Sequence, residues 1–204
     1  PVETLNLSGK NLGFASAVVI ASLISVNGAL TALNLSSNDL KDEGVSAVCE
    51  AIQSNKETKL ASLDFGYNGI HPVGANAVAA MVAVTGSLTV TNLLGNELDA
   101  ESAKMLAEVA KQKGISLCGI QRDQTTADFF FQDLKPPDAI TGIDKLRELH
   151  RGLDVDAGEH AVTADVGVDD GFDAVVFEFF SEVDHLMASQ FAPTVGGHFA
   201  VFGI

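Results

Sequence analysis

The sequence predicts an α/β solenoid, a stack of repeated strand–helix units, followed by an acidic and partly helical C-terminal region. Three observations support this fold class. A motif with leucine at fixed positions recurs through the first two thirds of the chain, with starts separated by 28, 30, 28 and 27 residues. Apolar residues between the copies recur at the spacing of an amphipathic helix. The negative charge is concentrated after the repeats, because residues 1–121 carry a net charge of −4 and residues 122–204 carry −11 of the total −15.

The second copy of the motif shows why each unit begins with a strand. Leu33 and Leu35 lie two residues apart and therefore point to the same face of an extended chain. Asn38 follows where the chain leaves the strand. We expect its side-chain amide to donate hydrogen bonds to backbone carbonyls of its own turn and the next turn. Asn68 and Asn96 recur at the same place, so a ladder of such amides is predicted.

A helix is predicted after each turn. Asp42 is placed to cap the helix of the second unit. Apolar side chains in that helix follow at i, i+3, i+4 and i+7 and form a stripe facing the strands: Val45, Val48, Cys49 and Ile52. Equivalent stripes predict helices within Phe14–Ile24, Val73–Val84 and Ala100–Val109.

This unit resembles the leucine-rich repeat, whose pattern is L-x-x-L-x-L-x-x-N-x-L. Units of about 28 residues with a full helix are similar to the ribonuclease-inhibitor-like class of these repeats. The resemblance covers residues 1–130 and implies strands on a concave face, helices on a convex face, and protein partners. Lys10 and Thr91 depart from the pattern, replacing its Asn and a Leu. The five copies read VETLNLSGKNL, LTALNLSSNDL, LASLDFGYNGI, LTVTNLLGNEL and ISLCGIQRDQT, beginning at residues 2, 30, 60, 88 and 115.

The repeat pattern fades near Thr125, and we place a boundary between a solenoid over residues 1–134 and an acidic helical region over residues 135–204. Helices are expected from Lys135 through Leu149 and over Ala174–Phe191, each with apolar residues on one face. We interpret this region as a module that caps the open C-terminal end of the solenoid. The alternative is that it docks on another protein, because its many phenylalanines offer more apolar surface than a cap needs.

Composition excludes several classes of function. A net charge of −15 argues against binding to nucleic acid or to anionic lipid. No apolar stretch is long enough to span a membrane. Two cysteines are too few for a disulfide scaffold, which favours a reducing location inside the cell, cytoplasmic or organellar. Since the chain opens with Pro1, we expect either that a targeting segment has been removed or that the chain is part of a longer polypeptide.

The strongest candidate for metal chemistry is an acidic loop between the two predicted C-terminal helices. Asp154, Asp156 and Asp165 stand at positions 1, 3 and 12 of a calcium-binding loop. However, Glu159 occupies the position where the sharp turn requires Gly, so a solvated acidic loop is the favoured interpretation.

Other chemical motifs are incomplete. Glu182 and His185 have the Glu-x-x-His form of di-iron bundles, but the sequence lacks the second copy that such a site requires. Cys-x-x-Cys pairs, nucleophile elbows and phosphate-binding loops do not occur. We therefore expect no catalytic residue, no metal ion and no cofactor.

The sequence favours a non-enzymatic protein-interaction or scaffold module, an accessory subunit of a larger organellar or membrane-associated hetero-complex. The alternative is a regulatory module, either calcium-responsive or similar to a GTPase regulator. Outward positions of successive strands are expected to line up in rows, one of which holds Asn6, Asn34, Asp64 and Asn92. The rows beside it end in Val90 and Leu94. Together they form a small, polar and flat concave surface with few of the anchors that binding hot spots use. The candidate partner-binding residues lie on this surface and in the Phe-rich C-terminal region: Asn34, Asp64, Tyr67, Asn92, Phe130, Phe179 and Phe180.

Overall fold

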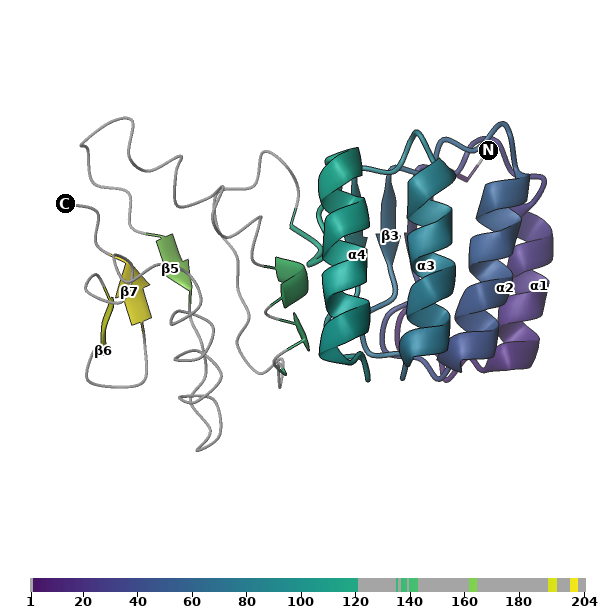
Figure 1. Ribbon diagram of the computed structural model, residues 1–204. Helices are drawn as coiled ribbons and strands as arrows, with labels where there is room; N and C mark the ends of the chain where they lie inside the picture. Colours follow the sequence, from purple (N-terminus) through teal and green to yellow (C-terminus); the bar gives the residue numbers. More distant parts are fainter. Residues whose placement is uncertain are drawn as a thin grey trace.

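The structure is a computed structural model in which strands and helices alternate along the chain (Figure 1). It describes residues 2–120, 135, 137–138, 140–142, 162–164, 191–193 and 199–201. The solenoid elements are β1 (Thr4–Asn6), α1 (Phe14–Ile24), β2 (Ala32–Asn34), α2 (Lys41–Ser54), β3 (Ser62–Asp64), α3 (Pro72–Val84), β4 (Val90–Asn92) and α4 (Ala100–Lys113). The four helices stand side by side in one layer, and the strands form a second layer. The predicted α/β solenoid is therefore confirmed.

The strands form a parallel sheet in the order β1-β2-β3-β4. Their register repeats without a slip, since Leu5 pairs with Leu33, Leu33 with Leu63, and Leu63 with Thr91. Each crossover between neighbouring strands passes through one helix, as parallel strands require. The result is that equivalent residues of successive units lie side by side across the sheet.

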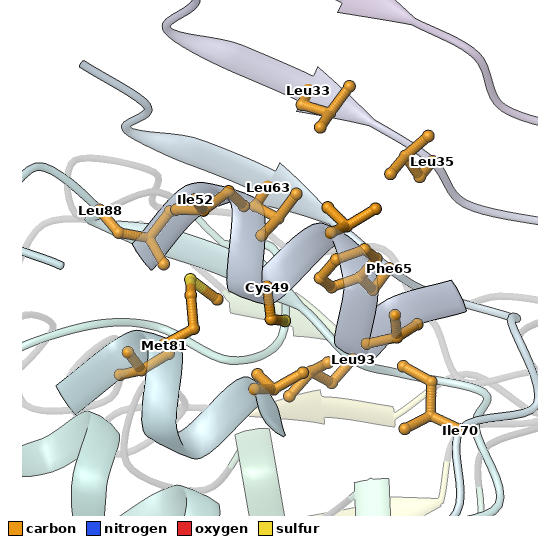
Figure 2. Close-up of a cluster of buried hydrophobic side chains, with 14 of the residues drawn as sticks. Leu33, Leu35, Cys49, Ile52, Leu63, Phe65, Ile70, Met81, Leu88 and Leu93 are labelled. Atoms are coloured by element: carbon orange, nitrogen blue, oxygen red, sulfur yellow. The ribbon is translucent and has the colours of Figure 1, made fainter. Parts of the chain in front are cut away.

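The core lies between the strand layer and the helix layer (Figure 2). Leu33 and Leu35 of the second unit, and Leu63 and Phe65 of the third, are at most 1% exposed. Cys49 of α2 lies among them, and burial raises the pKa of its thiol well above the ordinary value. The leucine positions of the motif are therefore core positions, and Cys49 is held as an inert neutral thiol.

The predicted asparagine ladder is confirmed. Asn68 is 1% exposed, and its amide donates to the carbonyls of Leu35, Phe65 and Gly66 at 2.9, 3.1 and 3.1 Å. Asn38 and Asn96 make the same pattern of bonds. In each case the one acceptor in another unit, which is Leu7, Leu35 or Phe65, belongs to the preceding turn and not to the next turn as predicted. The ladder satisfies carbonyls that the bend would leave unpaired in the interior.

The helix caps differ from one another, and one prediction about them is wrong. In α4, Asp99 accepts a hydrogen bond from the Ser102 N–H at 2.7 Å, which lowers the pKa of Asp99, and Gly114 ends the helix in the left-handed conformation. Asp42 does not cap α2, whose N-cap residue is Leu40. Its carboxylate instead accepts a hydrogen bond at 2.7 Å from the N–H of His71, the N-cap residue of the next helix. Asp42 thus links two successive units.

The repeat breaks at one core position. Thr91 replaces the leucine of the motif in β4 and is 0% exposed. Its hydroxyl is the one buried side-chain polar atom in the described part of the chain that has no hydrogen-bond partner. An unpaired buried hydroxyl destabilises a fold by about 1–3 kcal/mol. Thr91 therefore weakens the fourth unit.

Beyond the solenoid, residues 137–138 and 140–142 are helical, as expected for the start of the first C-terminal helix. Three short strands that were not predicted, β5 (Val162–Ala164), β6 (Phe191–Pro193) and β7 (Phe199–Val201), form an antiparallel sheet in the order β5-β7-β6. The end of the second predicted helix is wrong, because Phe191 belongs to β6. Pro193 disfavours helical backbone at Ala192, the residue before it, so a helix is not expected to continue through this point. The boundary at residue 135 stays a prediction.

Candidate protein-binding surface

The concave surface carries an in-register row of four polar side chains. Asn6, Asn34, Asp64 and Asn92 are neighbours across the sheet. Each side chain accepts a hydrogen bond from the backbone N–H two residues further on, at 3.0, 2.9, 2.9 and 3.1 Å. These bonds fix the rotamers of the row before any partner binds. The structure thus brings together three of the predicted binding residues in one line.

Asp64 is the ionisable member of this row. Burial raises the pKa of its carboxyl group above the ordinary value, while hydrogen bonds from the Gly66 N–H and the Asn92 side chain act in the opposite direction. Because the folded pKa is the higher one, the stability contribution of Asp64 is fully present below the unfolded pKa. It is lost as the pH rises through the folded pKa. Burial of the charged carboxylate costs free energy, and the other members of the row are neutral amides. Asp64 is therefore a candidate binding residue.

Tyr67 stands at the end of the same strand, where the chain turns. Its backbone has a φ of +55°, a conformation that a bulky residue rarely adopts. Its ring packs over Gly95 of the next unit, where any Cβ atom would overlap the ring. The side chain is still 37% exposed. Tyr67 therefore offers a rigid, half-covered aromatic surface, which is the kind of group that anchors protein interfaces.

The exposed concave surface is shorter than the sequence predicted. Val90 and Leu94 were expected among its outward positions, but they are 2% and 3% exposed. Both are apolar where the equivalent residues of the other units are mostly polar, and apolar side chains gain free energy from such burial. The surface open to a partner therefore belongs to the first three units and to Asn92.

Comparison with known proteins agrees with this repeated geometry. A family model described as "Leucine Rich repeat" matches residues 29–49 and 56–79. The solenoid of this chain is built from leucine-rich repeats. RAN GTPase-activating protein 2 of Arabidopsis thaliana is 32% identical over 112 residues, covering 55% of this chain and 20% of that protein. NACHT, LRR and PYD domains-containing protein 13 of Homo sapiens is 31% identical over 121 residues, covering 59% of this chain and 11% of that protein.

The leucine-rich-repeat fold is also seen in a solved structure titled "Leiomodin-1 Actin-Binding Site 2 (ABS2)". The match has a TM-score of 0.51 and 15% identity, and it covers 74% of this chain and 86% of that chain. At this identity the likeness shows the fold alone. The chain spans a fifth or less of the length of these two sequence relatives.

The sequence did not predict the contact that Asp138 makes with the fourth unit. This residue is 3% exposed, and its carboxylate accepts hydrogen bonds from the Gly95 N–H at 3.0 Å and the Lys135 N–H at 2.8 Å. Burial raises the pKa of its carboxyl group, against the effect of both hydrogen bonds. The Lys135 ammonium group also pairs with Glu97 at 2.9 Å. Asp138 therefore attaches the segment after the repeats to the turn of the fourth unit, next to Tyr67.

The remaining candidate residues lie outside the part of the chain that the structure describes. Their roles stay predictions: Phe130, Phe179 and Phe180 for a partner, and Asp154, Asp156 and Asp165 for calcium. Within the described residues, no cluster of three or more His, Cys, Asp or Glu side chains suits a metal ion. No helix among the described residues is long and apolar enough to cross a membrane.

Proposed function

We propose that the chain is a non-enzymatic protein-binding module, a scaffold or accessory subunit of a hetero-complex inside the cell. It binds its partner through the concave surface centred on Asp64 and Tyr67. The observation that carries this proposal is the rigidity of that surface. The row of side chains is held by backbone hydrogen bonds, and the Tyr67 ring is held against Gly95.

Rigidity matters because ordering side chains on binding costs about 0.5–1.5 kcal/mol for each one. Asn34, Asp64 and Asn92 are already ordered in the free protein, so little of that cost remains. Asp64 adds a negative charge in a partly buried setting, where attraction to a cation is less screened by salt than on the open surface. A partner that places a Lys or Arg side chain against Asp64 and an apolar group on Tyr67 fits this surface.

The first experiment measures the size of the native particle by gel filtration, followed by mass spectrometry of the proteins that co-elute. A stoichiometric set of co-eluting proteins is expected. Asp64→Asn and Tyr67→Asn should each remove those proteins, because they delete the charge and the ring. Asn is chosen at position 67 because it tolerates the left-handed backbone.

Glu50→Gln is the matched control, since it removes one negative charge from the exposed convex surface of α2. It should leave the particle unchanged, and circular dichroism should confirm that all three variants fold. A native particle of the mass of one chain would refute the scaffold proposal. A particle that both concave variants leave intact would refute the proposed surface.

A second candidate is regulation of a small GTPase. The observation that favours it is the 32% identity with the plant RAN GTPase-activating protein 2 over 112 residues. The test adds the purified chain to a Ran-type GTPase loaded with GTP and measures the release of inorganic phosphate. Faster release that depends on the dose of the chain would support this candidate. Release at the intrinsic rate would remove it.

A further inference from the structure

The turn after each strand of the solenoid contains one residue with a positive φ, and the hydrogen bond from its backbone N–H changes in the fourth unit. In the first three units this N–H donates to a main-chain carbonyl of the next unit: Gly9 to Ser36 at 2.9 Å, Ser37 to Gly66 at 2.9 Å and Tyr67 to Leu94 at 3.0 Å. Gly95 is the equivalent residue of the fourth unit, and its N–H donates to the Asp138 carboxylate at 3.0 Å. A side chain from a later segment therefore takes the place of a main-chain carbonyl.

The segment that carries Asp138, residues 135–142, is here called the strap. In its described part, Asp138 and Thr141 are 3% and 6% exposed. The Thr141 hydroxyl donates to the Asp138 carbonyl at 2.9 Å, and the Asp138 N–H donates to the Lys135 carbonyl at 2.9 Å. The Lys135 N–H donates in turn to the Asp138 carboxylate at 2.8 Å. These local bonds hold the carboxylate in the orientation that reaches Gly95.

The strap is attached next to the proposed anchor of the concave surface. Gly95 lies directly against the Tyr67 ring, and Asp138 binds the N–H of this same glycine. Tyr67 is 37% exposed with the strap in this position. A partner that places an apolar group on the Tyr67 ring must therefore approach the point where the strap is attached.

The contacts that attach the strap are weak ones. Burial raises the pKa of the Asp138 carboxyl group, so its charged form is buried at a cost in free energy that opposes the bonds from Lys135 and Gly95. The ion pair between Lys135 and Glu97 involves side chains that are 45% and 53% exposed, and surface pairs of this kind contribute little. The strap can therefore separate from the fourth unit while the repeats stay folded.

We propose that the strap is an autoinhibitory segment, which covers Tyr67 in the free protein and is displaced when a partner binds the concave surface. This inference deepens the proposed function and rests on it for the partner. On displacement, the Gly95 N–H exchanges the Asp138 carboxylate for water or for a group of the partner. The apparent affinity for the partner is then lowered in proportion to the fraction of chains in which the strap is released.

The fluorescence of Tyr67 reports the position of the strap, because the sequence contains one tyrosine and no tryptophan. Quenching of this emission by acrylamide measures how freely a small molecule reaches the ring in the full chain. Asp138→Ala deletes the acceptor of the Gly95 N–H and should release the strap. The quenching constant should rise by about 1.5-fold or more, since the ring is 37% exposed while the strap is attached.

A second variant releases the strap by another route. Lys135→Glu replaces the ion pair with Glu97 by two like charges and should also increase the quenching of Tyr67. Lys104→Glu makes the same charge change at an exposed residue of α4, and Glu50→Ala removes an acidic side chain from the exposed surface of α2. Both controls should leave the quenching unchanged, and circular dichroism checks that all four variants are folded.

Binding to the proteins that co-elute with the native chain tests the inhibition itself. Asp138→Ala should bind them at least about threefold more tightly, because no closed form competes with them. Unchanged quenching in the folded Asp138→Ala and Lys135→Glu variants would overturn the proposal. Weaker binding by a variant whose ring is uncovered would also overturn it, since the strap would then be part of the binding surface.

The two readouts separate this inference from the proposed function. If no protein co-elutes with the chain, the proposed function and the role of a partner in displacing the strap fail together. The quenching experiment needs no partner, and it alone decides whether the strap covers Tyr67.

Discussion

Replacing Thr91 by valine should make the protein more stable. Thr91 is 0% exposed in a row whose other members are Leu5, Leu33 and Leu63, and its hydroxyl has no hydrogen-bond partner among the described residues. Valine has the same shape and replaces the hydroxyl by a methyl group. Removal of the unpaired group should raise the free energy of unfolding by about 1–2 kcal/mol. For a chain of this length that corresponds to a rise of about 2–8 °C in the melting temperature.

Urea unfolding followed by circular dichroism measures this change, with the midpoint expected to rise at a constant slope. Thr85→Val is the matched control. Thr85 is also buried, at 6% exposure, but its hydroxyl donates a hydrogen bond to the Met81 carbonyl at 2.8 Å. This control should lose about 0.5–1.5 kcal/mol. If Thr91→Val were neutral or destabilising, the hydroxyl would not be the weak point that its burial indicates.

Three further predictions concern polar groups of the solenoid. Asn68→Ala should lower the free energy of unfolding by about 3 kcal/mol or more in urea, because several buried backbone groups lose their hydrogen-bond partner. Asn76→Ala, on the exposed side of α3, is the control and should have little effect. Asp64→Asn should be more stable than the wild type near neutral pH. This advantage should disappear below about pH 4, where the carboxyl group of the wild type is protonated. Thermal melts across this pH range measure the difference. Asp138→Ala should speed hydrogen exchange at the Gly95 N–H, whose acceptor is deleted, and an unchanged rate would show that this contact does not form in solution.

The sequence predicted the solenoid well because its packing is periodic. Leu33 and Leu63 meet across the sheet, so each unit needs the same residue type at the same place. Asn68 was predictable for the same reason, since its partners lie in its own turn and in the adjacent turn. Even here the direction of the ladder was missed, because the spacing of a motif does not say on which side its neighbour lies.

The contacts that the sequence did not predict are not periodic. Asp138 reaches Gly95 across 43 residues, and no spacing in the chain indicates that pair. Val90 and Leu94 are 2% and 3% exposed, although the repeat pattern alone places them at outward positions. Asn34, Asp64 and Asn92 were predicted as one row and lie in one row, but the bonds that fix their side chains became visible only in the structure.

The rates at which the two buried cysteines are labelled would report local opening of the solenoid. Cys49 lies in α2 of the second unit, and Cys118 follows α4 at the other end of the repeats. Because a thiol reagent reaches neither sulfur in the folded state, each labelling rate records how often the surrounding helices and strands separate. Units of a solenoid contact mainly their neighbours, so the two rates are free to differ. Their ratio would reveal which end of the stack unravels first, without any added probe.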